Sequence, residues 1–380
     1  MFKQTILVAA VVGLVLALGT AAWADTYDWT RDGASDTFEW DEGNGDNWNP
    51  DTGTGYPNAI GDVANMRNSY QYLSNIQTTD AWKQEVLIDR DITVGTILLG
   101  MTWNSNPRAG QIFTINAGFR LIMDDLDDVA EIQKNDSPHN AGVTRRFPIT
   151  FQGAGTIELN DDLVIANEGT LSGRRLQFDV AITENGGPFD VTKTGPGIVI
   201  FGGNNTYTGD TKVNEGELTL TNLSALAGSS LDVSGAGTVQ FGVTGTNTYN
   251  LGGLKGQGSI NAGTNTLKVK SLSPGNSVGQ LTVSNPLDIS AIIDTEKLVF
   301  ELGADTTAGT TYDHVSMAGK TLTLGTLNFA DFTFTTVAGF DAGVYTLFDA
   351  GSITGSIGTA DGTIGGLAAK IGRASCRERV

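Results

Sequence analysis

The sequence predicts an all-β protein: a parallel β-helix, or β-solenoid, with a Trp-containing N-terminal cap and an antiparallel β-rich C-terminal cap. Apolar and polar residues alternate in short runs bounded by Gly, Asn and Thr, as in short strands separated by turns. A Gly-x-Gly phrase also recurs at multiples of about 21 residues. Its copies are GAGTIEL, GPGIVIF, GAGTVQF and GQGSINA, which begin at Gly153, Gly195, Gly235 and Gly256. Strands that turn this often suit the stacked coils of a solenoid.

The solenoid itself is expected over residues 80–286, with its clearest unit at 192–222. Residues 25–79 hold Trp29, Trp40 and Trp48, and bulky aromatic side chains can cover the open apolar end of a solenoid. Residues 287–372 contain longer alternating runs, which favour an antiparallel β-rich region. One helix is expected, at Asp124–Lys134.

The two ends of the chain differ from its body. Residues 1–24 combine Lys3, an apolar run and the small-residue pattern Ala22-Trp23-Ala24, which predicts a secretory signal peptide. The apolar run is shorter than the roughly 20 residues of a membrane span, which disfavours a retained N-terminal anchor. No later apolar stretch is long enough to cross a membrane as a helix, so no transmembrane segment is expected in the mature chain. Residues 373–380, RASCRERV, hold the only Cys and are interpreted as a non-native tail. The protein is therefore expected outside the cell or on its surface.

The charge of the chain excludes some partners. A formal net charge of −19 opposes binding to nucleic acid, which needs a positive field. The expected partners are extracellular polysaccharide or cell-surface components.

Acidic residues are the first candidates for chemistry. Asp161, Asp162 and Glu168 lie close in sequence, but neighbouring strand residues point to opposite faces, so they are interpreted as solvated corners. No catalytic residue is assigned, and the chain is predicted not to be an enzyme.

Acidic and aromatic residues also offer candidates for metal and sugar sites. Asp41, Asp46, Asp124 and Asp127 are weak Ca²⁺ candidates, because Ca²⁺ prefers oxygen ligands, yet the spacing of a dedicated loop is absent. We therefore expect no metal and no cofactor. Trp29, Trp40 and Trp48 are speculative sugar-binding platforms, with packing in a cap or core as the alternative.

One stretch resembles a known family. TKTGPGIVIFGGNNTYTGDTKVNEGELTLTN, residues 192–222, is similar to the autotransporter-associated β-strand repeat, also called the passenger-associated transport repeat. The similarity includes seven positions: Gly195, Gly197, Asn205, Thr206, Tyr207, Gly209 and Gly216. GDNWNP near the start and SLSPGNSVGQLTVSN from Ser271 resemble segments that flank such repeats.

The resemblance implies a bacterial β-helix passenger that is exported and then displayed or released, with the repeat assisting export and folding. The predicted function is thus that of a structural or adhesive β-solenoid. The alternative is a carbohydrate-binding or polysaccharide-degrading β-helix. In either case, the glycines are expected at tight corners, where a positive φ or close backbone contact is needed.

Overall fold

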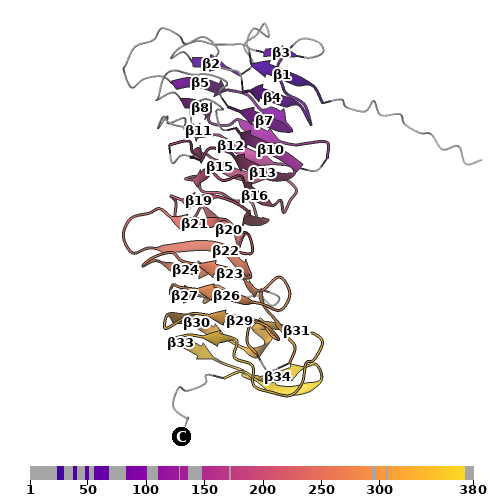
Figure 1. The fold of residues 1–380 in the computed structure, drawn as a ribbon, viewed down its shortest axis with the longest axis vertical. Coiled ribbons are helices and arrows are strands. Elements are labelled where there is room, and N and C mark those ends of the chain that lie inside the picture. Colours follow the sequence, from indigo (N-terminus) through magenta and orange to yellow (C-terminus); the bar gives the residue numbers. More distant parts are fainter. Residues whose placement is uncertain are drawn as a thin grey trace, which may run out of the picture.

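Short strands stack into a tall column in the computed structural model, with the N-terminal coils at one end and the C-terminal coils at the other (Figure 1). The structure describes residues 24–29, 37–40, 48–50, 55–67, 83–100, 110–127, 129–135, 148–170, 173–292, 297–304 and 307–372. The predicted signal peptide, apart from Ala24, and the predicted non-native tail lie outside these residues.

One long sheet follows the whole column. Its strands are β1 (Thr26–Trp29), β3 (Trp48–Pro50), β4 (Val63–Met66), β7 (Thr96–Leu99), β10 (Val129–Lys134), β13 (Asp162–Asn167), β16 (Val191–Thr194), β18 (Asp210–Val213), β20 (Leu226–Asp232), β22 (Thr248–Gly256), β24 (Thr266–Val269), β25 (Leu272–Pro274), β27 (Leu287–Asp288), β28 (Leu298–Leu302), β30 (Thr321–Leu327), β31 (Phe332–Thr336) and β33 (Ser352–Ile357).

Shorter sheets form the other faces. The second sheet holds β2 (Thr37–Glu39), β5 (Lys83–Ile88), β8 (Gly110–Ile115), β11 (Ile149–Gly153), β14 (Leu176–Phe178), β17 (Ile198–Phe201), β19 (Glu217–Leu220) and β21 (Thr238–Phe241). The third sheet holds β6 (Ile92–Val94), β9 (Arg120–Met123), β12 (Thr156–Leu159) and β15 (Ala181–Glu184). The fourth sheet holds β23 (Gly258–Ile260), β26 (Gln280–Val283), β29 (His314–Ser316) and β32 (Phe348–Asp349).

Successive coils stack on one another, so each coil adds one level to the column. In the coils up to β16, the chain visits the second, third and long sheets in turn. Around the repeat, Val191 pairs with Thr211 and Thr211 pairs with Leu231, so a coil there takes about 20 residues. This matches the period predicted from the Gly-x-Gly phrases and confirms the parallel β-solenoid.

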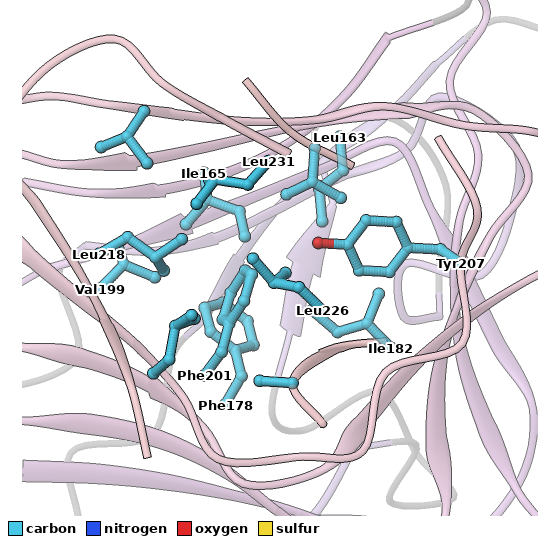
Figure 2. Packing of buried hydrophobic residues seen from close by; sticks show 14 of the residues in the cluster. Leu163, Ile165, Phe178, Ile182, Val199, Phe201, Tyr207, Leu218, Leu226 and Leu231 are labelled. Atoms are coloured by element: carbon cyan, nitrogen blue, oxygen red, sulfur yellow. The ribbon is translucent and has the colours of Figure 1, made fainter. Parts of the chain in front are cut away.

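The core fills the inside of the column. Along each strand, alternate side chains point inward, and Figure 2 shows Phe178, Phe201, Leu218 and Leu226 packed together from successive coils. On the second sheet, contacts between aromatic rings continue this pattern over four coils, two of them stacked and the last one edge-on. The ring centroids of Phe113 and Phe151 are 4.7 Å apart, those of Phe151 and Phe178 5.1 Å, and those of Phe178 and Phe201 5.8 Å.

The long sheet divides into two columns at β22. The first half of β22 pairs with β24 and its second half with β25, both in parallel. From there, one column continues through β27, β30 and β33, and the other through β28 and β31. The solenoid cross-section therefore changes at this level.

The C-terminal region corrects one expectation. The strands from β28 to β33 pair in parallel. Among the described residues of 287–372, antiparallel pairing is limited to a hairpin of β34 (Asp361–Ile364) and β35 (Leu367–Lys370) and to an isolated bridge between Leu302 and Tyr312. Alternating apolar residues occur in antiparallel strands and in solenoid strands alike, so the pattern did not separate the two.

The helix expected at Asp124–Lys134 is also wrong. Val129–Lys134 forms strand β10, because Ala130, Ile132 and Lys134 alternate inward with a period of two. Among the described residues, helical backbone is limited to the 3₁₀ turn Phe329–Asp331, and no helix is long and apolar enough to cross a membrane.

Parallel stacking begins before the expected start at residue 80. Strand β4 pairs in parallel with both β1 and β7, while β1 and β3 pair antiparallel at the N-terminal end.

Candidate functional site

The segment with the family resemblance spans about one and a half coils in the middle of the column, because its strands β18 and β19 stack on its own β16 and β17. We call residues 191–220, with strands β16, β17, β18 and β19, the repeat coil. It pairs with β13 and β14 of the preceding coil and with β20 and β21 of the following one.

Asn205 links the repeat coil to the coils on both sides. Its side chain is buried at the corner between β17 and β18. The Oδ1 atom accepts a hydrogen bond from the N–H of Ile182 at 2.9 Å, and Nδ2 donates to the carbonyl of Ala225 at 2.9 Å. A single amide thus pairs backbone groups that would otherwise be buried without partners.

Tyr207 begins a buried chain of hydroxyl groups. Its OH lies 2.5 Å from Thr211 Oγ1, which lies 2.7 Å from Ser229 Oγ. Ser229 Oγ donates to the carbonyl of Gly209 at 2.7 Å, so the donors run from Tyr207 through Thr211 to Ser229. Burial raises the pKa of Tyr207, which keeps the phenol neutral. Figure 2 shows its hydroxyl directed into the core.

The glycines of the repeat coil occupy corners in two ways. Gly195 and Gly216 have φ values of 72° and 68°. Gly197 and Gly209 instead allow close approach: a Cβ on Gly209 would lie 2.1 Å from the carbonyl oxygen of Phe189, and one on Gly197 2.6 Å from that of Asn167.

Thr206 is the one family position with an exposed side chain. Its backbone N–H donates to the carbonyl of Ile182 at 2.9 Å. The next exposed residue, Thr208, donates its hydroxyl to Glu184 at 2.6 Å. The outer surface at this corner is therefore polar, whereas the side chains that point inward, those of Asn205 and Tyr207, are buried.

Two buried lysines were missed by sequence reasoning. Lys193 Nζ donates to the carbonyls of Thr194, Gly195 and Glu215, and burial lowers its pKa to about 8. Lys134 Nζ lies 3.5 Å from Asn167 Oδ1, and burial lowers its pKa to about 7. The two-residue period of a strand could have indicated their burial. Lys193 lies two residues after the inward-facing Val191, and Lys134 lies two residues after the inward-facing Ile132.

The three tryptophans come together at the N-terminal end of the column, where all are buried. The ring centroids of Trp29 and Trp48 are 4.9 Å apart, and those of Trp40 and Trp48 are 5.0 Å apart. Trp40 Nε1 donates to the carbonyl of Pro57 at 3.1 Å, and Trp48 Nε1 donates to that of Trp40 at 2.7 Å. These contacts place the rings in the core, which is the packing alternative to a sugar-binding platform.

Two of the four Ca²⁺ candidates lie among the described residues. Asp41 and Asp46 lie outside the described residues. Asp124 Oδ2 accepts a hydrogen bond from Asn160 at 2.9 Å, whereas Asp127 is exposed. Within the described ranges, no group of three or more His, Cys, Asp or Glu residues could hold a metal ion.

The carboxylates weighed for catalysis make contacts in different directions. Asp161 Oδ2 accepts from the N–H of Asp125 in the preceding coil, at 2.5 Å. Asp162 Oδ1 accepts from the N–H of Asp190 in the following coil, at 2.8 Å. Both carboxylates therefore act as corner acceptors that join coils.

Asp313 is a further carboxylate that the sequence did not single out. Its two oxygens accept hydrogen bonds from the N–H groups of Gly279 at 2.8 Å and Glu301 at 2.7 Å. Burial raises its pKa to about 6. The neighbouring His314 is also buried, and burial lowers its pKa.

The comparison with known families points to the repeat coil. The family model for the passenger-associated-transport-repeat matches residues 191–220, which are the repeat coil. No curated protein and no solved structure matches the chain. The resemblance noted in the sequence is thus confirmed for this coil. A passenger repeat within a parallel β-solenoid supports a protein of the autotransporter passenger type, and this family suggests a secreted or cell-surface location.

Proposed function

We propose that this chain is an exported structural or adhesive β-solenoid, displayed on or released from a bacterial cell, whose repeat coil assists export and folding. Residues 1–24 direct export, and the polar faces of the column meet extracellular polysaccharide or cell-surface components. On this proposal the protein acts by presenting a surface and carries out no catalysis.

The observation that carries the proposal is the bonding of Asn205 to two neighbouring coils. The amide fits only when the preceding coil presents Ile182 and the following coil presents Ala225. A coil that fixes the register of both neighbours favours correct stacking as the chain emerges from a membrane unfolded. Growth of a solenoid by nearest-neighbour contacts makes such a coil a natural starting point.

Replacement of Asn205 tests the role in export and folding. In Asn205→Ala, the N–H of Ile182 and the carbonyl of Ala225 lose their partners, each at a cost of about 1–3 kcal/mol. We expect a lower yield of protease-resistant protein outside the cytoplasm at equal synthesis. Thr206→Ala, at the exposed neighbouring position, is the matched control. Equal yields from the two variants would contradict the role of the repeat coil.

Two further measurements test export and adhesion. Removal of residues 1–24 should leave the chain in the cytoplasm, and export without them would contradict the signal peptide. Beads coated with the purified chain should adhere to bacterial or polysaccharide-coated surfaces more strongly than beads coated with the heat-unfolded chain. Equal retention of the two would argue against adhesion, and release of new reducing ends from the polysaccharide would argue for a degrading enzyme.

A further inference from the structure

The second sheet stops at strand β21. This strand pairs in parallel with β19, and it is the terminal strand of its sheet. The next strand along the chain outside the long sheet, β23, pairs with β26 and opens the fourth sheet. Both strands lie in the continuously described run 173–292, and no pairing joins them there. One edge of β21 is therefore open.

The backbone groups on that open edge belong to Val239 and Phe241. The N–H groups of Thr238 and Gly242 donate to the carbonyls of Gly216 and Leu220, each at 2.8 Å, toward β19. Because alternate residues of a parallel strand bond to the same neighbour, Val239 and Phe241 direct their N–H and C=O groups away from β19. Within run 173–292, neither makes a backbone hydrogen bond on that side.

The two residues whose backbone groups face this edge have apolar side chains. Val239 and Phe241 are only partly buried against the core, whereas their register partners in β19, Leu218 and Leu220, are fully buried. The ring of Phe241 meets that of Tyr249 edge-on at a centroid distance of 4.7 Å. Natural proteins usually protect a strand edge with charges or Pro, and TVQF has neither.

Charge singles out the same part of the molecule. The chain carries a net charge of −19, yet no Asp or Glu occurs between Val233 and Leu287. Two of the three lysines in this stretch contact carboxylates outside it, Lys255 at Asp210 and Lys268 at Asp288. Two copies of this chain would repel one another over most of their surface, but the repulsion is least where β21 lies.

We propose that the open edge of β21 is a docking surface for β21 of a second copy, which pairs with it antiparallel about a two-fold axis near Gln240. The N–H of Val239 would donate to the C=O of Phe241 in the other copy, and the C=O of Val239 would accept from the N–H of that Phe241. The same two bonds would join Phe241 of the first copy to Val239 of the second. A two-fold axis uses the same patch on both copies, as closed dimers require. This inference goes beyond the proposed function, because it assigns a partner and a contact surface.

The contact is small, so the dimer is weak and depends on concentration. Sedimentation velocity on the chain from Asp25 onward, over a wide concentration series, tests it. We expect the weight-average mass to rise toward that of a dimer. A mass that stays monomeric throughout would overturn the proposal. A mass that rises past that of a dimer would also overturn it, because pairing of the two β21 edges leaves no open β21 edge for a third copy.

Val239→Pro is the sharpest variant. Proline removes the N–H that faces the open edge. The hydrogen bonds between β19 and β21 are kept, because none of them uses this N–H, and edge strands tolerate proline. We expect association to weaken at least about tenfold, through the lost hydrogen bonds. Circular dichroism and the thermal midpoint establish that the column still folds.

Gln240→Lys provides an independent check should the proline variant unfold. It brings two like charges together near the two-fold axis, so dimerisation should weaken and then recover as salt is added. Thr219→Lys is the matched control, because Thr219 is the register partner of Gln240 one coil away, in a strand with both edges paired. If Gln240→Lys and Thr219→Lys weaken association equally, or if neither does, the β21 contact is refuted.

Discussion

Gly216 combines two constraints at a single residue. Its φ of 68° is in the left-handed region, and a Cβ there would lie 2.6 Å from the carbonyl oxygens of Gly195 and Gly197. The sequence-based expectation of a positive-φ corner is thus confirmed. The close approach of another coil's corner could not be read from the sequence.

Gly216→Val should therefore unfold the protein at a lower urea concentration than the wild type. Gly186→Val is the control, because Gly186 also has a positive φ, 94°, but no atom lies within 4 Å of the position of its Cβ. The control should lose about 1–2 kcal/mol from backbone strain alone, and Gly216→Val distinctly more. Equal losses would mean that the packing of the corner contributes nothing.

Asp313 should give the protein a measurable pH dependence. Its pKa in the folded state is raised to about 6, above the 3.8 of an ordinary Asp. A raised carboxyl pKa means that the folded state holds the proton more tightly, so this contribution to stability is full below about pH 4 and is lost as the pH rises through 6.

For each protein, the change in the free energy of unfolding between pH 4 and pH 7 is the quantity to compare. This change should consequently be smaller in Asp313→Asn than in the wild type. Chemical denaturation at a series of pH values measures this. Asp361→Asn, on the exposed hairpin, should retain the wild-type pH profile. Identical profiles for all three proteins would remove Asp313 as the source.

Among the elements, the aromatic stack on the second sheet lies wholly in the core. Phe151 is enclosed between Phe113 and Phe178, with interplanar angles of 14° and 4°. Phe151→Ala should lower the free energy of unfolding by about 3–5 kcal/mol, because it removes a large apolar side chain and leaves a cavity.

Thr150→Ala, the neighbouring residue on the opposite face of β11, is the matched control and should change the stability little. Thermal unfolding followed by circular dichroism measures both variants. Similar midpoints for the two would show that the stack collapses around the cavity or contributes little.

At the scale of the elements, the location of the repeat could be predicted from the sequence, but the partners of its side chains could not. The repeat coil was located because its glycines and alternating residues lie in one short stretch. The bonds of Asn205 to Ile182 and Ala225 depend on three coils, so only the residue type, and not its partners, was visible in the sequence. Strand β10 was mistaken for a helix because DDLDD resembles a helix start, although the two-residue period of Ala130 and Ile132 indicated a strand.

At the scale of the molecule, the sequence predicts a solenoid over residues 80–286, but the Gly-x-Gly repeat that indicates it begins only at Gly153, where the coils are shorter. Phe113 of β8 pairs with Phe151 of β11 across a much longer coil, which hides the repeat in the first half of the chain. In the C-terminal part, His314 similarly stacks on Gln280 across a long loop, and the parallel pairing went unrecognised. Sequence periodicity reports coil length, whereas stacking itself depends on contacts that tolerate insertions between strands.

The coil stack also governs how the molecule would respond to a pulling force. A coil of about 20 residues adds only about 4.8 Å to the column, yet the same residues reach about 66 Å when drawn straight. Because the chain has a single Cys, no internal disulfide would halt the extension.

Stretched between its ends, the protein should yield in successive steps of about this contour length as coils peel away, and single-molecule force spectroscopy would register them. One abrupt rupture of the whole column would contradict this expectation. If such a chain tethered a cell, its coils would unfold one after another under flow and lengthen the tether. The coils would fold again when the load is removed.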